Sequence, residues 1–497
     1  MLSLLILIPL AGSLLIGLLP SSFSSARIRS VALGVTALVG LLTLKLILDF
    51  NLGDPGFQFE EYLPWIPQLG LSYSLGMDGL SLSLMGLSAI LTPIAIASSR
   101  PDTPRPRLYY SMILLVSAAV AGAFVAQNLL LFVLFYELEL IPLYLLIGIW
   151  GSDKRGYAAM KFLIYTALSG ILILAGFLGL TWLSGSGSFD FDAINTEKIS
   201  QISQLILITV LLIGFGIKIP LVPLHTWLPD AYVESSAPVT ILLGGLLAKL
   251  GTYGLVRFCL QLFPDTWQLI GPGLSIIGVI SVMYGALTAI AQQDIKRMVA
   301  YSSIGHMGYI IVATAAGTEV SLIGAISQMV AHGLILAILF HLVGVVETKV
   351  GTRELKLLNG LMNPIRGLPL ISALLIAAGM ASAGIPGLVG FVAEFLVFQG
   401  TFVVFPVQSL LCIIASGLTA VYFVILLNRT CFGRLDNNLA YYPKVSLSER
   451  APALVLAALI LFLGVQPSWL LRWSSPTAKQ MALELNGIRV QQVANRL

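Results

Sequence analysis

Four of the ionisable side chains inside long apolar stretches are candidates for chemistry: Glu137, Lys218, Lys249 and Glu394. A charge at the centre of a bilayer costs roughly 2.5–3.5 kcal/mol on insertion scales, so such residues persist only with partners, water or a function. Carboxylates and amines in apolar surroundings are groups that can take up and release protons. We therefore expect a proton or ion path. The alternative is a set of static salt bridges that hold helices together.

The first candidate pair is Glu137 with Lys218. Glu137 lies in FVLFYELELIPLYLL, where Glu139 follows two residues later, so the two carboxylates point about 200° apart around a helix. We expect one to face the bundle interior and the other a partner subunit or a polar pocket. Lys218 precedes the first proline of GFGIKIPLVPLHTWLPD. A movable Glu137–Lys218 pair would act as a proton switch, because the lysine holds its proton while the pair is close and can release it when the pair separates.

The other two charges stand further along the chain. Lys249 lies in GGLLAKLGTYGL, whose small residues permit close helix packing and water entry. Glu394 lies in SAGIPGLVGFVAEFLVF and is a candidate terminal acceptor on a proton exit path. The alternative for Glu394 is a buried, permanently protonated acid.

The four histidines are further candidates, because an imidazole titrates near neutral pH. His225 lies in the proline-rich segment after Lys218, His306 in YSSIGHMGY and His332 in QMVAHGLIL. For each of them a hydrogen-bonded core histidine is the alternative. His341 has no further support and is interpreted as a core residue.

Other chemistries find no support in the sequence. The three cysteines are far apart and form no CxxC pair, which argues against an iron–sulfur cluster, a zinc site and a disulfide framework. The sequence contains no GxxxxGK[ST] motif and no GxGxxG after a strand, which argues against ATP-driven transport and dinucleotide binding. Bis-histidine haem ligation needs two histidines facing each other across helices, and nothing in their spacing requires this. We expect no cofactor and no metal in this chain.

The composition indicates which kind of secondary structure carries these residues. Of 497 residues, 57% are hydrophobic and only 10% are charged, whereas a soluble domain carries about 25% charged residues. Disordered tails, nucleic-acid binders and ordinary soluble enzymes are thereby excluded. The long continuous apolar runs lack the alternation of β-barrel strands. The sequence predicts an all-α membrane protein of many spans.

Windows of about 17–25 apolar residues predict fourteen transmembrane helices. The first is expected to be a retained helix rather than a cleaved signal peptide. The predicted spans lie near 3–19, 31–48, 76–98, 109–126, 128–149, 161–184, 205–229, 237–260, 272–291, 299–316, 320–346, 369–400, 407–427 and 452–471.

Two of these spans are predicted to be broken helices. The seventh contains Pro220, Pro223 and Pro229, and the twelfth contains Pro386 among several glycines. Interruptions at corresponding places indicate two repeats, spans 4–8 and 9–13, and an odd repeat length places them in inverted topology. The resulting division has an N-terminal three-helix segment, two five-helix repeats that each form a proton half-channel, and a C-terminal helix with a tail, at 1–108, 109–260, 272–430 and 431–497.

Lysines and arginines predict the orientation. With fourteen spans, most of those in the loops fall on one face, which the positive-inside rule places in the cytoplasm. Both termini are then expected on the opposite side.

Several blocks in fixed order resemble one family over nearly the whole chain. They are MDGLSLSL (77–84), FYELELIPLYLL (135–146), KIPLVPLHTWLPDAYVESSAPV (218–239), LLAKLGTYGLVR (246–257), QDIKRMVAYSSIGHMGY (293–309), QMVAHGL (328–334) and GIPGLVGFVAEF (384–395). In this order they resemble the antiporter-like, proton-pumping subunits of complex I, of the M type or chain 4. The ELELIPLYLLIGIWG block followed by KRGYAAMKFLIYT is most similar to the cyanobacterial and chloroplast form.

The resemblance implies roles for the candidate residues. Glu137 matches the glutamate of the fifth helix and Lys218 its lysine partner on the seventh. Lys249 matches the central lysine of the eighth helix. Glu394 matches an acid of the twelfth, where the other antiporter-like subunits usually carry lysine. His225, His306 and His332 match histidines that link these charges.

The resemblance also implies a function. The chain is expected to be a membrane-arm subunit of an NAD(P)H- or ferredoxin-driven plastoquinone reductase, moving protons without a redox centre of its own. Plastoquinone and the electron donor would bind to other subunits. The expected partners are neighbouring antiporter-like chains and lipids, with no nucleic acid, in a cyanobacterial or chloroplast thylakoid membrane. A variant serving cyclic electron flow or carbon dioxide uptake fits the same pattern, and a cation/proton antiporter subunit of the multi-subunit type is the alternative.

Overall fold

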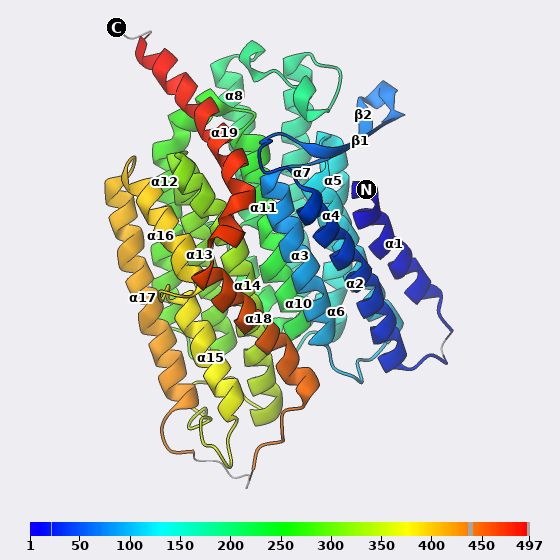
Figure 1. Ribbon diagram of the computed structural model, residues 1–497, viewed down its shortest axis with the longest axis vertical. Coiled ribbons are helices and arrows are strands. Elements are labelled where there is room, and N and C mark those ends of the chain that lie inside the picture. Colours follow the sequence, from blue (N-terminus) through cyan, green and yellow to red (C-terminus); the bar gives the residue numbers. More distant parts are fainter. Residues whose placement is uncertain (21, 436–440, 495–497) are drawn as a thin grey trace.

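The chain folds into a bundle of helices with one two-stranded hairpin (Figure 1). The computed structural model describes residues 1–20, 22–435 and 441–494. The helices of the first half are α1 (Leu2–Leu18), α2 (Ser25–Asp49), α3 (Gly79–Ala97), α4 (Pro106–Val125), α5 (Leu129–Leu138), α6 (Leu140–Trp150), α7 (Arg155–Ser184), α8 (Gln201–Lys218), α9 (Trp227–Glu234), α10 (Ala237–Leu242) and α11 (Ala248–Gly254). Those of the second half are α12 (Pro264–Ile290), α13 (Ile295–Ala316), α14 (Glu319–Val350), α15 (Pro369–Ser382), α16 (Val389–Phe402), α17 (Pro406–Cys431), α18 (Leu447–Val465) and α19 (Ser468–Ala494).

The apolar helices confirm an all-α membrane protein. Within the described residues, twelve helical segments are long and apolar enough to cross a membrane, and three shorter apolar helices, α1, α15 and α16, accompany them. The count of fourteen spans, the inverted relation of the two repeats and the division into four parts stay predictions.

Both predicted helix breaks are present. Helix α8 ends at Lys218, and the chain turns through two prolines before α9 resumes at Trp227. Helix α15 ends at Ser382, and α16 begins at Val389 after Gly384 and Gly387, which adopt φ of 68° and 89°. These positive φ values favour glycine because other residues place their Cβ in a clash there.

Two further irregularities were not predicted. The fifth span is divided into α5 and α6, with Glu139 between them. The eighth span contains two π-helical turns, Leu243–Leu247 and Leu255–Leu260, on either side of α11. Such turns often mark functional sites in helices.

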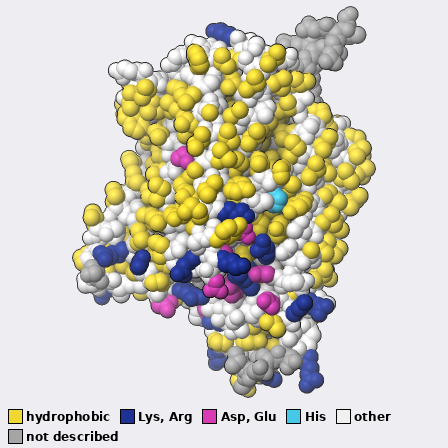
Figure 2. Space-filling model, turned by 180° about the vertical axis from the view of Figure 1, so that it is seen from behind, with side chains coloured by type: hydrophobic (Ala, Val, Ile, Leu, Met, Phe, Trp, Pro, Cys, Tyr) yellow, Lys and Arg dark blue, Asp and Glu magenta, His cyan; other side chains and the backbone are white. Residues whose placement is uncertain are grey.

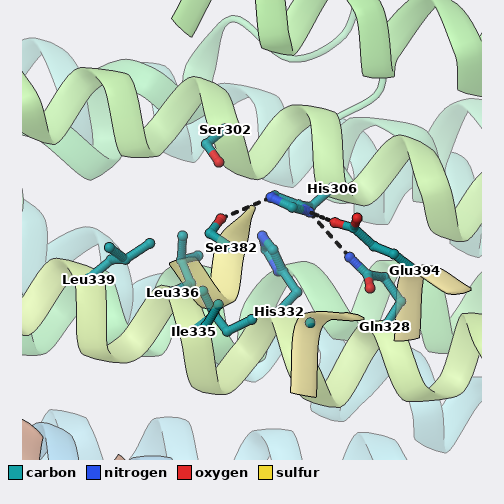
Figure 3. Close-up of a pocket in the computed structure, with 11 residues that line it drawn as sticks. Ser302, His306, Gln328, His332, Ile335, Leu336, Leu339, Ser382 and Glu394 are labelled. Carbon is teal, nitrogen blue, oxygen red and sulfur yellow. Dashed lines mark hydrogen bonds and ion pairs between the residues drawn. The ribbon is translucent and has the colours of Figure 1, made fainter. Parts of the chain in front are cut away.

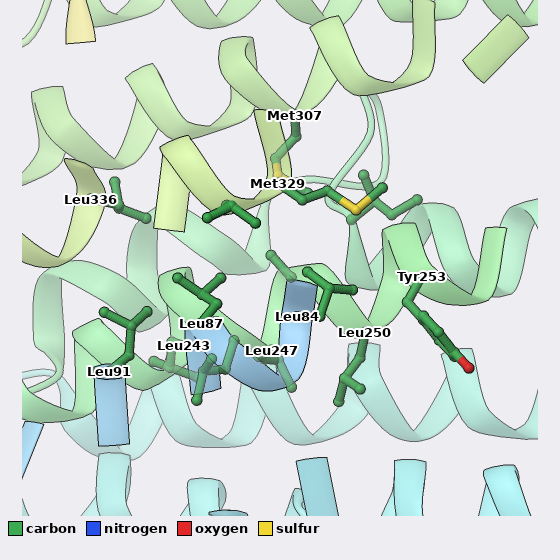
Figure 4. Packing of buried hydrophobic residues seen from close by; sticks show 14 of the residues in the cluster. Leu84, Leu87, Leu91, Leu243, Leu247, Leu250, Tyr253, Met307, Met329 and Leu336 are labelled. Atoms are coloured by element: carbon green, nitrogen blue, oxygen red, sulfur yellow. The ribbon is translucent and has the colours of Figure 1, made fainter. Parts of the chain in front are cut away.

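The core lies around the eighth span, which is fully buried. Helix α14 contacts α3, α10, α13, α16 and α19, and so runs through the middle of the molecule. Figure 4 shows leucines of α3 and the eighth span packed against Met307, Met329 and Leu336. Gly245 packs closely on this cluster, since a Cβ built there would lie 2.4 Å from the end of the Leu91 side chain. Lys249 is therefore enclosed by tight apolar packing.

The remaining elements lie at the periphery. Strands β1 (Gln58–Ile66) and β2 (Leu71–Met77) form an unpredicted antiparallel hairpin in which Leu63 pairs with Tyr73. Helix α19 crosses the bundle and contacts α3, α12 and α14 (Figure 1). Figure 2 shows Lys and Arg gathered toward one end of the molecule, beside a broad apolar surface. Which end faces the cytoplasm stays a prediction of the positive-inside rule.

Candidate functional site

The Lys218 ammonium is buried in an ion pair at the end of α8. Its Nζ lies 2.6 Å from Glu139 Oε1, donates to the Tyr136 carbonyl at 3.3 Å and sits 3.1 Å from the centre of the Tyr136 ring. Both charged side chains are at most 2% exposed. The C-terminal end of a helix also favours a cation, because its last carbonyls point outward. The ammonium thus has a carboxylate, a carbonyl and an aromatic face as partners.

The predicted ion pair between Glu137 and Lys218 is wrong for this structure, in which Lys218 pairs with Glu139. The Glu137 carboxylate lies instead against α7, where a Cβ built on Gly170 would be 1.9 Å from Glu137 Oε1. The expectation that the two carboxylates face different surroundings is confirmed.

The division of the fifth span explains this placement. Pro142 lacks the N–H that would bond to the carbonyl of Leu138, the last residue of α5. Glu139 therefore lies at a discontinuity, with α6 starting after it. The signal was present in the sequence as the ELELIP block.

Lys249 is joined directly to His332. Its Nζ lies 2.6 Å from the Gly244 carbonyl and 2.6 Å from His332 Nδ1. The Gly244 carbonyl belongs to the first π-helical turn, five residues before the lysine. A charged ammonium can donate only to an unprotonated Nδ1, so a proton passed along this bond leaves neutral Lys249 and charged His332. The predicted link between this lysine and a histidine is present.

His306 lies beside His332 and reaches Glu394 (Figure 3). The two imidazole ring centres are 5.6 Å apart. His306 Nδ1 is 3.5 Å from Glu394 Oε1 and 3.3 Å from Gln328 Nε2, while its Nε2 is 3.1 Å from Ser382 Oγ. A protonated Nδ1 would face the carboxylate, and an unprotonated Nδ1 can accept from the amide. His306 therefore has partners in both protonation states.

Glu394 is held at the break between α15 and α16. Ser416 donates to its Oε2 at 2.7 Å, and a Cβ on Gly384 would be 2.8 Å from the same oxygen. The small cavity lined by His306, His332 and Glu394 measures about 10 Å³, roughly the room that one water needs. Lys249 of the first predicted repeat thus joins His332, His306 and Glu394 of the second in one polar series.

Two histidines lie outside this series. His225 packs against the Tyr284 ring, with ring centres 4.7 Å apart, and makes no described hydrogen bond to Lys218 or Lys249. Its predicted linking role therefore has no contact to support it in this structure. His341 Nε2 lies 2.7 Å from the Glu449 carbonyl, which fits its interpretation as a core residue.

A buried ion pair that was not predicted lies at the opposite end of the eighth span. Arg257 Nη2 lies 2.6 Å from Asp78 Oδ2, and both side chains are at most 3% exposed. Asp78 also caps α3 by accepting from the Ser81 amide at 3.0 Å. The pair borders a cavity of about 360 Å³. The sequence places Asp78 near a span end and Arg257 in a loop, and nothing in their spacing pairs them.

The described part of the chain contains no cluster of side chains arranged as a metal site. No group of three or more His, Cys, Asp or Glu side chains there is arranged to hold a metal ion. The cysteines Cys259, Cys412 and Cys431 are buried free thiols.

The chain is similar to known proteins over most of its length. Residues 126–419 match the family model described as NADH:quinone oxidoreductase/Mrp antiporter, TM. A protein of Synechococcus sp. strain JA-2-3B'a(2-13), named NAD(P)H-quinone oxidoreductase chain 4 1, is 37% identical over 100% of this chain and 95% of its own length. One from Thermosynechococcus vestitus, named NAD(P)H-quinone oxidoreductase chain 4 2, is 41% identical over 80% of this chain and 74% of its own.

Two solved structures share the fold. A chain of respiratory complex I from Thermus thermophilus superposes with a TM-score of 0.88 at 28% identity, covering 98% of this chain and 99% of its own. A chain of the Mrp complex from Dietzia sp. DQ12-45-1b superposes with a TM-score of 0.85 at 21% identity, covering 97% of both.

Proposed function

The chain belongs to the NADH:quinone oxidoreductase/Mrp antiporter transmembrane family, and on that premise we propose that it is the chain 4 subunit of a complex I-like NAD(P)H-quinone oxidoreductase. Its part in the enzyme is to move protons across the membrane. Quinone reduction, in other subunits, supplies the energy. In this proposal the chain needs no redox centre of its own.

One observation carries this proposal: the series of buried ionisable groups from Lys249 to Glu394. Each neighbouring pair is joined by a contact or a short gap, namely 2.6 Å between Lys249 and His332, 5.6 Å between the imidazole centres, and 3.5 Å from His306 to Glu394. Four such groups in an apolar core cost several kcal/mol of desolvation. A static structural role needs no such series of proton carriers.

The residues can pass a proton by exchanging hydrogen-bond partners. Lys249 donates to His332, one water in the small cavity could bridge His332 to His306, and His306 faces Glu394. Gln328 and Ser382 keep the His306 ring oriented when it is neutral. Glu394 is the acid at the end of the series.

The Lys218–Glu139 pair is the gate in this proposal. While the pair is closed, Lys218 keeps its proton and its positive charge is neutralised. When the pair opens, the uncompensated ammonium lies in the apolar bundle and favours loss of protons from nearby groups. Quinone chemistry elsewhere in the complex would drive the opening.

The proposal also includes the neighbouring subunits, the lipids and the membrane around this chain. Only 28% of the apolar window of α2 and 22% of that of α18 are buried, so these helices offer wide surfaces to lipids or neighbouring subunits. Plastoquinone and the electron donor bind other subunits. The cyanobacterial origin of the relatives supports a thylakoid membrane.

A cation/proton antiporter of the multi-subunit type is the second candidate, favoured by the likeness to the Mrp chain. The oxidoreductase relatives at 37–41% identity favour the first function, whereas the Mrp likeness at 21% concerns the fold alone.

The test is to purify the complex that contains this chain and reconstitute it into vesicles. We expect proton uptake that begins when an electron donor and a quinone are added, and that does not depend on sodium. Quinone reduction without proton uptake would refute the proposal. Sodium-driven proton movement by a complex with no quinone reductase activity would establish the second candidate instead.

A further inference from the structure

Arg472, in α19, is a charged side chain that meets no anion in the described part of the chain. Its guanidinium carbon lies 3.8 Å from the centre of the Trp469 ring and 4.5 Å from that of Trp473. Its contacts with the described residues are these two rings, and its buried Nε meets no hydrogen-bond acceptor among them. A guanidinium carries five N–H donors, so this one keeps its hydrogen-bonding capacity for a group outside the chain.

Two other buried cations of the bundle have carboxylates of their own. Lys218 Nζ lies 2.6 Å from Glu139, and Arg257 Nη2 lies 2.6 Å from Asp78. An arginine at the edge of the bilayer is costly without such a partner. The absence of an internal carboxylate at Arg472, among the described residues, therefore points to an anion from the surroundings.

Arg472 stands level with the end of a membrane span. Gly79 is the first residue of α3, which is long and apolar enough to cross a membrane. Its amide donates to Thr477 Oγ1 at 3.0 Å, and a Cβ built on it would lie 2.0 Å from the Trp473 carbonyl oxygen, so α19 lies directly on the beginning of α3. The neighbouring Arg472 is therefore near the membrane–water boundary, at the end of the bundle that carries β1 and β2 (Figure 1).

The side chains beside Arg472 suit contact with lipid. The Trp469 ring is exposed, and its centre lies 6.1 Å from the ring centres of Phe462 and Trp473. Phe462 and Val465, in the last turns of α18, are exposed as well. Tryptophan is enriched at the level of lipid headgroups, and the exposed apolar end of α18 can receive acyl chains.

An anionic lipid headgroup supplies what Arg472 lacks. A guanidinium is planar and presents pairs of N–H donors that match two oxygens of one phosphate. The two indole rings favour its positive charge and hold its plane in place. Phosphate and acyl chains in one molecule fit both the unused donors and the apolar surface next to them.

We propose that Arg472 binds the phosphate of an anionic phospholipid, with Trp469 and Trp473 holding the guanidinium and the exposed end of α18 receiving the acyl chains. The bound lipid fills the angle between α18 and α19 and holds α19 on the beginning of α3. The site is separate from the series from Lys249 to Glu394 and does not depend on the proposed function.

The test uses the intact complex with a photo-crosslinking amino acid in place of Val465, and mass spectrometry identifies what it captures. The complex is kept in detergent with phosphatidylglycerol or with phosphatidylcholine of the same acyl chains. We expect capture of phosphatidylglycerol, and a decrease of about tenfold or more in Arg472→Gln, because charge-assisted hydrogen bonds are lost. Lys479→Gln removes an exposed cation from the same helix, and this matched control should capture the lipid as the wild type does.

Two milder variants keep the test decisive if Arg472→Gln does not assemble. Arg472→Lys keeps the charge but loses the planar pair of donors. Trp469→Leu removes one of the two rings that hold the guanidinium. Both should lower the capture of phosphatidylglycerol by a smaller factor than Arg472→Gln, and wild-type capture in both would overturn the proposal.

The remaining outcomes separate the possible occupants. Equal capture of the two lipids, or unchanged capture in Arg472→Gln, would show that the headgroup charge is not recognised and would overturn the proposal. Capture of a neighbouring protein chain in place of lipid would overturn it too, because Arg472 would then pair with a carboxylate of that chain. Loss of the captured lipid on addition of inorganic phosphate would indicate a site for the free ion and would equally contradict a lipid site.

Discussion

Replacing Lys218 by methionine tests how much free energy the buried ion pair can deliver. At the observed 2.6 Å, the Coulomb energy is about 6 kcal/mol at an effective dielectric of about 20. At a separation of about 7 Å it falls to about 2.4 kcal/mol. Opening the pair therefore changes the energy of the site by about 4 kcal/mol, whereas moving one charge against 100 mV costs about 2.3 kcal/mol.

Methionine keeps most of the side-chain volume of Lys218 and removes the charge, so the opening step no longer changes the electrostatic energy. Glu139 can accept a proton to avoid remaining as a lone buried charge. We expect the complex to assemble and to reduce quinone within about threefold of the wild-type rate. Its proton uptake should fall by at least about tenfold, because the loss exceeds 1.4 kcal/mol.

The assay follows quinone reduction by absorbance and proton uptake by a pH-sensitive dye in the same vesicles. Lys198→Met, which removes an exposed lysine, is the control and should behave as the wild type. Unchanged proton uptake in Lys218→Met would refute the reasoning that the charge of Lys218 drives transport.

Three further predictions concern other parts of the molecule. Gly384→Ala should lower proton uptake by about tenfold, because alanine is strained at a φ of 68° and its Cβ would lie 2.8 Å from Glu394 Oε2. The control is Gly273→Ala, whose Cβ meets open space. Equal proton uptake by the two variants would contradict the expected placement of Glu394. Asp78→Asn should destabilise the chain by about 3–5 kcal/mol, because it leaves Arg257 buried without its carboxylate, and this loss is measured as a lower Tm. The control Asp102→Asn, at an exposed site, should leave Tm unchanged. Burial alone would raise the pKa of Glu61, but hydrogen bonds from the Met1 amino group and Ser3 hold that pKa below its ordinary value. The contact therefore stabilises the N-terminal end of α1 fully at pH values above the ordinary pKa of a glutamate. This stabilisation is lost as the pH falls through the lowered pKa of Glu61. Protease cleavage near residue 1 should accordingly increase on acidification, and Glu61→Gln should remove this pH dependence while Glu60→Gln keeps it.

The sequence was sufficient where a residue type by itself imposes a structure. Pro220 and Pro223 cannot continue a helix with full hydrogen bonding, so the break after α8 was predictable. Lys249 and Glu394 stood out because charge is costly in an apolar run. Their linking histidines, His306 and His332, were expected from the resemblance, and the structure places them together.

The sequence was insufficient where packing decides between near alternatives. Glu137 and Glu139 are both glutamates in the same apolar segment, so the sequence does not say which of them pairs with Lys218. The break between α5 and α6 places Glu139 against Lys218. Asp78 and Arg257 are far apart in the chain, so their pairing depends on the tertiary fold. The π-helical turns around Lys249 have no sequence signal that periodicity alone could detect.

The central claim is that protons cross through the series from Lys249 to Glu394. Its most direct test is proton uptake per quinone reduced in vesicles that contain the Lys249→Met complex. Lys45→Met, which removes an exposed lysine from the apolar helix α2, is the control. We expect the control to pump as the wild type does, and Lys249→Met to retain quinone reduction but lose nearly all proton uptake. Undiminished proton uptake in Lys249→Met would contradict it.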